Sequence, residues 1–122
     1  MITNGLVRSF KDAFAGLYFC LTTQRNMVIH VIVGIIVITV AFFLEIHRLE
    51  KIILLATVFL VIILETVNTA VEKTVDVATR EYSRDAYLAK VVSASAVLLS
   101  VFLAVLIGVV ILGPPLLGML LS

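Results

Sequence analysis

Three stretches without a fixed charge constrain the fold of this chain more than any other feature. They are the nineteen residues between Arg25 and Glu45, the segment Ile52 to Leu64, and everything from Val91 to Ser122. At about 1.5 Å per residue, a helix of nineteen residues matches a hydrocarbon core of about 30 Å. With 62% hydrophobic and 14% charged residues in 122, the chain is too apolar for an ordinary soluble domain, so we predict an all-α membrane protein.

We expect one domain, residues 1–122, with transmembrane helices at 26–46, 52–78 and 88–112. The second helix is free of charge only to Leu64, so it completes a crossing only by including Glu65 and Glu72. Part of it must therefore face protein or water. Pro114 and Pro115 predict that the third span ends near Leu112.

The cations in the connecting segments predict the orientation. Three Lys or Arg precede the first span, two follow it, and four lie between the second and third spans. By the positive-inside rule, the N-terminus and the 73–90 segment face the cytoplasm, and the 45–51 loop and the C-terminus face outward. The polar residues after Leu64 are therefore expected on the cytoplasmic side of the membrane.

Residues 5–24 form a different kind of helix, because the apolar side chains from Leu6 to Leu21 gather on one arc while Arg8, Lys11 and Asp12 lie outside it. We expect this amphipathic helix to lie on the membrane surface, with its apolar arc in the headgroup boundary. The alternative is that the arc packs on another protein helix.

Small residues form a stripe along the third span, on Ser93, Ala96, Ser100, Ala104 and Gly108. Small residues let membrane helices approach closely. Three helices with one polar face do not enclose a site well, so we expect a cyclic homo-oligomer that turns this stripe and the Glu65 face inward.

The polar face of the second span carries Glu65, Asn68, Glu72 and Asp76 at i, i+3, i+7 and i+11, which lie on one side of a helix. An ionisable group at membrane depth is costly, so function is its default interpretation. Glu65 is deepest and suits proton exchange with a lipid hydroxyl. Glu72 lies about 10 Å away, nearer the headgroups, where a hard cation could bridge a carboxylate and phosphate oxygens.

Each of these residues also has a plainer interpretation. Glu65 with Asn68 could only hold helices together. Glu72 and Asp76 could be interfacial charges that pair with Lys73 or Arg80, which is the favoured interpretation for Asp76. Lys90 alone could be a membrane-interface anchor. His30 is expected one turn into the first span as a hydrogen-bonded interface residue, with a catalytic role as the less favoured alternative.

The cytoplasmic segment supplies cations that can steady nucleotide phosphates: Arg80, Arg84 and Lys90. Together with the acidic face, they suggest phosphoryl transfer from a soluble nucleotide to a membrane alcohol. The chain has neither a phosphate-binding loop of the Gly-x-x-x-x-Gly-Lys type nor a kinase glycine-rich loop. A net charge of +1 predicts no affinity for nucleic acid, and the single Cys20 rules out an internal disulfide.

A resemblance to a known family rests on several segments between about Arg8 and Gly108. They are RSFKDAFAGL, RNMVIH before the first span, ETVNTAVEKTVD at the end of the second, then Glu81-Tyr82, Ala89-Lys90 and SAVLL. The chain resembles the small bacterial membrane kinases that include diacylglycerol kinase and undecaprenol kinase.

The resemblance implies a homotrimer with a surface helix, three spans per protomer and active sites shared between subunits at the cytoplasmic interface. It also implies a location in the inner (plasma) membrane of a bacterial cell. It implies ATP as donor, Mg²⁺ as cofactor, Glu65 as general base, Asn68 as its polar partner and Glu72 as a metal ligand. It also implies that Lys90 contacts the nucleotide phosphates and that Glu81, Tyr82 and Ser83 contact the nucleotide.

Two residues depart from the family pattern. Gln24 stands where the family usually has a second metal-binding glutamate, and an amide is a weaker magnesium ligand than a carboxylate. Val91 stands where the family usually has aspartate after the lysine. Weaker metal binding and slower turnover are expected from these differences.

The function predicted from these observations is an ATP-dependent lipid kinase. The full-length third span and the RN-x-x-x-H segment favour undecaprenol over diacylglycerol as the acceptor. One rival is a small oligomeric transporter in which Glu65 cycles protons, although the chain shows no inverted repeat. Another is a catalytically weakened family member that acts as a membrane scaffold.

Overall fold

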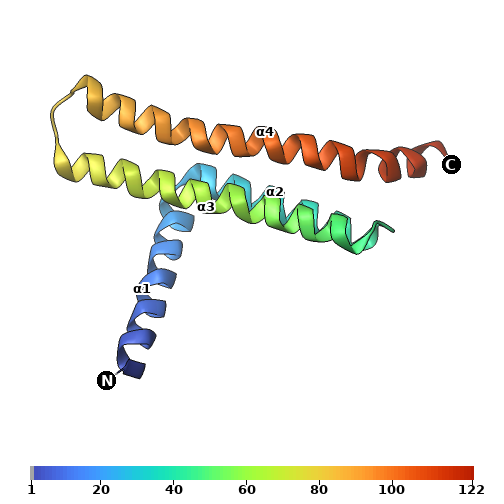
Figure 1. The fold of residues 1–122 in the computed structure, drawn as a ribbon, viewed down its shortest axis with the longest axis horizontal. Helices are drawn as coiled ribbons and strands as arrows, with labels where there is room; N and C mark the ends of the chain where they lie inside the picture. The colour runs from blue at the N-terminus through green and yellow to red at the C-terminus, as the bar shows by residue number, and fades with distance from the viewer. Residues whose placement is uncertain (1) are drawn as a thin grey trace.

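The computed structural model describes residues 2–122, which form four helices: α1 Ile2–Thr23, α2 Arg25–Phe43, α3 Arg48–Ala78 and α4 Arg84–Leu121. None of these residues lies in a strand. In Figure 1, α3 and α4 run side by side along most of their length, and α1 leaves the bundle at a steep angle. The helix α2 lies along the N-terminal half of α3. The predicted all-α fold is confirmed.

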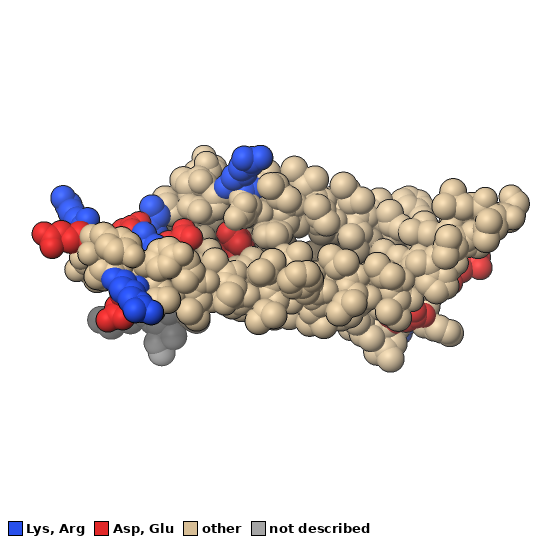
Figure 2. Space-filling view, turned by 90° about the horizontal axis from the view of Figure 1, so that it is seen from above, with Lys and Arg blue, Asp and Glu red and all other residues tan. Residues whose placement is uncertain are grey.

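Three of the helices are long and apolar enough to cross a membrane: α2 with 19 residues, α3 with 31 and α4 with 38. Figure 2 shows that the charged side chains gather mainly at the end of the bundle where α3 connects to α4, while the middle is almost bare of them. The three predicted spans are therefore confirmed, whereas the depth at which each enters the membrane stays a prediction.

Close packing joins α2 to α3 near the middle of the bundle. A Cβ atom on Gly34 would lie 2.5 Å from Cγ1 of Val58, so only glycine allows this approach of the two helices. Toward the α2–α3 loop, a buried cluster from three helices contains Ala41, Leu44, Leu54, Ile111 and Leu112. The antiparallel helices are thus held together at mid-bundle and at the end opposite the charged loop.

The C-terminal part of α4 differs from the sequence expectation. The helix does not end near Leu112 but continues through Pro114 and Pro115 to Leu121. Each proline removes one backbone donor, but in an apolar environment the remaining carbonyl and N–H groups still need intrahelical partners, which favours continuing the helix.

The small-residue stripe of α4 faces the chain's own bundle in part. Ser100 is buried, and Ser93, Ala104 and Gly108 are half-buried, where α4 packs against α3. The stripe therefore serves close packing within one protomer, and its role between protomers stays a prediction.

The helix α1 includes the predicted amphipathic segment and carries exposed apolar side chains, among them Phe10, Phe14 and Tyr18. Near its C-terminal end, Cys20 is buried and the ammonium of Lys73 on α3 lies 5.4 Å from the centre of the Phe19 ring. The end of α1 is therefore attached to α3, while its position on a membrane surface remains a prediction.

Candidate active site

The polar face of α3 is buried where it passes through the bundle. The residues Glu65, Asn68 and Thr69 are 3%, 6% and 3% exposed, Glu72 is half-buried, and Asp76 is exposed. The period of the helix places these side chains on one side, and the crossing of α2 and α4 covers the deeper members. Exposure therefore rises along the face from Glu65 to Asp76.

The carboxylate of Glu65 pairs with a histidine on the neighbouring helix. Nε2 of His30 on α2 lies 3.7 Å from Oε2 of Glu65, and the two side chains are 19% and 3% exposed. His30 lies on the side of α2 that faces α3, and its pairing with Glu65 did not follow from the sequence. The contact joins residues far apart in the chain, and the periodicity of α2 does not show which turn meets which part of α3.

One turn further along α3, Asn68 contacts Glu72. Nδ2 of Asn68 donates to Oε1 of Glu72 over 3.3 Å. Oδ1 of Asn68 is buried and has no hydrogen-bond partner. A buried amide oxygen usually has a partner, so this atom is available to a donor or cation that is not part of the chain.

This arrangement fits a magnesium ion of the kind used with nucleotides. Mg²⁺ takes oxygen ligands and is often held by only one or two carboxylates, together with phosphates and water. The Glu72 carboxylate with the unpartnered Asn68 oxygen beside it is such a partial set. Residues 2–122 contain no group of three His, Cys, Asp or Glu side chains that could hold a metal. Phosphates, water or a further side chain would complete the coordination.

Gln24 lies at the junction of α1 and α2, where it precedes the first residue of α2. It is half-buried, and its Nε2 donates to Oγ1 of Thr23 over 3.2 Å. No hydrogen bond within the described part of the chain joins it to Glu72. The role of Gln24 as a metal ligand therefore stays a prediction.

At the charged end of the bundle, Lys90 and Asp76 form the ion pair that crosses from α4 to α3. Nζ of Lys90 lies 2.6 Å from Oδ1 of Asp76, and the side chains are 39% and 53% exposed. The prediction that Asp76 pairs with Lys73 or Arg80 was wrong. The α3–α4 loop brings the first turns of α4 back beside the last turns of α3, so a cation distant in sequence reaches Asp76 first.

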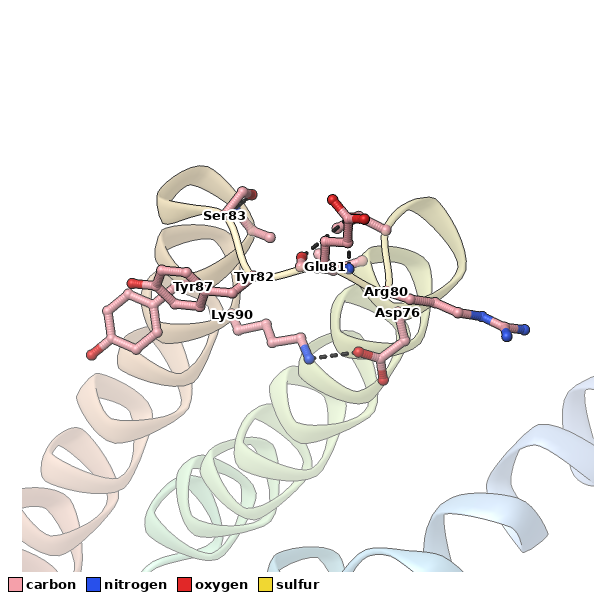
Figure 3. A pocket seen from close by; sticks show the side chains of 10 residues that line it. Asp76, Arg80, Glu81, Tyr82, Ser83, Tyr87 and Lys90 are labelled. Atoms are coloured by element: carbon pink, nitrogen blue, oxygen red, sulfur yellow. Dashed lines mark hydrogen bonds and ion pairs between the residues drawn. The ribbon is translucent and has the colours of Figure 1, made fainter.

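A polar cavity of about 550 Å³ surrounds this pair. Figure 3 shows the side chains of Asp76 and Lys90 directed toward each other below the loop that carries Glu81, Tyr82 and Ser83. The side chains that line it come from the end of α3, the loop and the start of α4: Val75, Asp76, Thr79, Arg80, Glu81, Tyr82, Ser83, Ala86, Tyr87 and Lys90. The four predicted nucleotide contacts therefore line one cavity.

Local hydrogen bonds shape this loop. The backbone N–H of Glu81 donates to Oγ1 of Thr79, and the Ser83 hydroxyl accepts from the Ala86 N–H as the N-cap of α4. The Thr79 turn and the capped start of α4 give the cavity a defined wall. Asp76, which the sequence left as an interfacial charge, belongs to this site.

The acidic residues on the polar face of α3 thus lie in a line. Asp76 follows Glu72 by one turn, and Glu65 precedes Glu72 by two, about 10 Å along the axis. The polar cavity is at one end of this line and the buried His30–Glu65 pair is at the other. Such a line connects a cavity that is open to a water-soluble phosphate donor with a buried carboxylate that a membrane-embedded acceptor could reach.

Three helices that can span a membrane carry a line of carboxylates that starts at the buried Glu65 and ends at the cavity beside Asp76. These features define a small integral-membrane enzyme. Residues 11–112 match the family model for prokaryotic diacylglycerol kinase. The chain belongs to this family of lipid kinases. A kinase family implies ATP as the phosphoryl donor.

Two relatives of this chain are named after different lipid substrates. A diacylglycerol kinase of Synechocystis sp. is 40% identical over 120 residues, covering 98% of this chain and 69% of the relative. An undecaprenol kinase of Bacillus subtilis is 31% identical over 113 residues, covering 93% of this chain and 92% of the relative. The family is therefore shown, and the acceptor is not fixed by similarity.

Proposed function

We propose that this protein transfers the γ-phosphoryl group of ATP to the hydroxyl of a membrane lipid alcohol, with undecaprenol as the acceptor. The observation that carries the proposal is the line of polar groups on α3, which connects the cavity at Asp76 and Lys90 with the buried Glu65. The RN-x-x-x-H segment, which ends at His30, supports the polyprenol acceptor.

In the proposed reaction, Glu65 takes the proton of the acceptor hydroxyl as the O–H bond breaks. The acceptor oxygen forms a bond to the γ-phosphorus, and the bond from that phosphorus to the β,γ-bridging oxygen breaks, so ADP leaves. Because Glu65 is buried, water is kept away from the acceptor oxygen that Glu65 deprotonates. This favours phosphoryl transfer to the lipid over hydrolysis of ATP.

The other site residues bind and orient the donor. Lys90 provides a cation for the phosphates, and Glu81, Tyr82 and Ser83 contact the nucleotide along the cavity wall. Glu72, Asn68 and Gln24 would hold Mg²⁺, which neutralises charge on the phosphates when bound. Asn68 also orients Glu72 through their hydrogen bond.

The proposal includes the assembly and its orientation. A homotrimer with sites shared between subunits would bring a further polar surface to the exposed end of the α3 face. We place the charged α3–α4 end in the cytoplasm of a bacterial cell, at the inner membrane, because four of the nine Lys and Arg residues lie in the 73–90 segment.

Diacylglycerol is the second candidate acceptor, because the relative with 40% identity is a diacylglycerol kinase. One experiment separates the candidates: purified protein with γ-labelled ATP, Mg²⁺ and either undecaprenol or diacylglycerol in mixed micelles. We expect label in undecaprenol phosphate and loss of labelling in Glu65→Gln. Glu45→Gln, which changes an exposed carboxylate at the opposite end, is the matched control. Labelling of neither lipid by the unaltered protein would overturn the proposal.

A further inference from the structure

At the end of the bundle opposite the α3–α4 loop, a groove of about 150 Å³ lies between α2 and α3. Its walls are apolar, and the two ionisable side chains that line it are both cations. The lining residues are Ile38, Ala41 and Phe42 of α2 and Arg48, Lys51, Ile52, Leu54 and Leu55 of α3. The groove therefore combines apolar walls with two positive charges.

The charged side chains around the start of α3 are divided by sign between two sides of the helix. Arg48 and Lys51 line this groove, whereas Glu45 and Glu50 line a separate cavity beside α4. Within residues 2–122, neither cation forms an ion pair with a carboxylate. The positive charge at the groove is thus not neutralised by the described part of the chain.

The position of these two cations is unfavourable for the protein alone. Arg48 is the first residue of α3 and Lys51 lies in its first turn, where the positive end of the helix dipole repels a cation. In the proposed orientation this end faces outward, where membrane proteins carry fewer Lys and Arg residues. A bound anion would offset the repulsion from the helix dipole.

Lys51 also has a defined place at the groove. Its Nζ atom lies 5.6 Å from the centre of the Phe42 ring, which is within the range of a cation–π interaction. This contact holds the ammonium between α3 and α2. Arg48 precedes Lys51 by three residues, so the two side chains lie on neighbouring turns of one helix face. A phosphate between them can accept hydrogen bonds from both.

The apolar part of the groove extends from the cations toward the middle of the bundle. On α3 it runs from Arg48 to Leu55, about 10 Å, and on the antiparallel α2 from Phe42 to Ile38. A phospholipid of the outer leaflet has the same order of groups, because its phosphate lies at the headgroups and its chains point to the midplane.

We propose that this groove binds an anionic phospholipid, with the phosphate on Arg48 and Lys51 and part of one acyl chain along Ile38 and Leu55. The groove is too narrow for a helix, which is about 10 Å across with its side chains. Lys51 precedes Glu65 by fourteen residues, about 21 Å along α3, so this lipid is not the phosphoryl acceptor. The proposal does not depend on the kinase reaction.

Lipid retention by the intact protein tests the charged part of the site. The purified protein is titrated in detergent with phosphatidylglycerol or with phosphatidylcholine of the same chains, and bound lipid is counted by native mass spectrometry. We expect tighter binding of phosphatidylglycerol. In Lys51→Gln its Kd should rise about tenfold, because cations at the membrane surface attract anionic lipid, and adding Arg48→Gln should raise it further.

Lys73→Gln is the matched control. Lys73 also lies on α3 over a phenylalanine ring, 5.4 Å from the centre of Phe19, but it is outside this groove. It should keep the Kd of the unaltered protein for phosphatidylglycerol. An equal loss in Lys51→Gln and Lys73→Gln would show that any interfacial lysine attracts this lipid, and equal affinity for the two phospholipids would show that the cations do not select it. Either result would overturn the proposal.

A second pair of variants tests the apolar part. Leu55 is 43% exposed, so Leu55→Phe can fill the groove without entering the core, and Leu60→Phe is its control because Leu60 is 37% exposed and outside the groove. Only Leu55→Phe should weaken phosphatidylglycerol binding, and inorganic phosphate should not displace the lipid. Displacement by phosphate would reveal an anion site without a place for a chain. A smaller oligomer in Leu55→Phe would mean that a second copy of the chain covers the groove. Both outcomes would overturn the assignment.

Discussion

Nε2 of His30 lies 3.7 Å from Oε2 of Glu65, which makes this pair the polar contact between α2 and α3 at the deepest point of the candidate site. In residues 2–122, only this pair and the Lys90–Asp76 pair join charged or ionisable side chains of different helices. One pair stands at the proposed acceptor hydroxyl, and the other at the proposed nucleotide cavity.

Replacing His30 should slow the reaction without weakening nucleotide binding. His30→Ala removes the partner that holds the Glu65 carboxylate, and we expect kcat to fall about tenfold or more, since a misplaced catalytic group has large effects on rate. His30→Gln keeps a donor and should retain more activity than the alanine variant. Steady-state kinetics with ATP and lipid varied separately will measure this.

The matched control is His47→Ala, because His47 is exposed in the loop before α3. It should keep the kcat of the unaltered enzyme. If His30→Ala matched that kcat, or if KM for ATP rose as much as kcat fell, His30 would have no role in positioning Glu65.

Removing the cation of Lys90 should affect the donor. Lys90→Met keeps the aliphatic stem but leaves the phosphates without this charge, so we expect KM for ATP to rise about tenfold, the effect of about 1.4 kcal/mol. Lys51→Met removes a cation at the far end of α3 and should leave KM for ATP unchanged. If Lys90→Met and Lys51→Met had the same KM for ATP, Lys90 would have no role in binding the nucleotide.

Much of this fold could be predicted from the sequence, because crossing a hydrocarbon core requires long uncharged helices. The helical period likewise placed Glu65, Asn68 and Glu72 on one face, and the structure buries the first two. These features depend on residues close together in the chain, which is where sequence patterns are informative.

Contacts between helices could not be predicted in the same way. The His30–Glu65 pair depends on the vertical register of α2 against α3, which is set by packing such as that of Gly34 on Val58. The Lys90–Asp76 pair depends on the conformation of the loop between the two helices. Neither register nor loop conformation is encoded by a period within one helix.

Restoring a carboxylate at residue 24 should strengthen metal binding. A glutamate is a better ligand for Mg²⁺ than an amide, so Gln24→Glu should lower the Mg²⁺ concentration that gives half-maximal activity. Asn26→Asp makes the same change of charge at an exposed position of α2 and is the control. A Mg²⁺ titration of activity measures both. An unchanged midpoint in Gln24→Glu would mean that other groups complete the metal site.

The close approach of Gly34 to Val58 should make the protein less stable when residue 34 carries a side chain. Gly34→Ala places a Cβ 2.5 Å from Cγ1 of Val58, and overpacking of this kind costs about 1–3 kcal/mol. Because the clash is with one side chain, Val58→Ala in the same chain should recover much of that loss. Gly118→Ala, where a Cβ meets nothing within 4 Å, should not destabilise the protein. Thermal unfolding of Gly34→Ala, Val58→Ala, the double variant and Gly118→Ala in one detergent measures the coupling. Losses that simply add in the double variant would show that the helices do not meet at this point, and the register that brings His30 to Glu65 would then need revision.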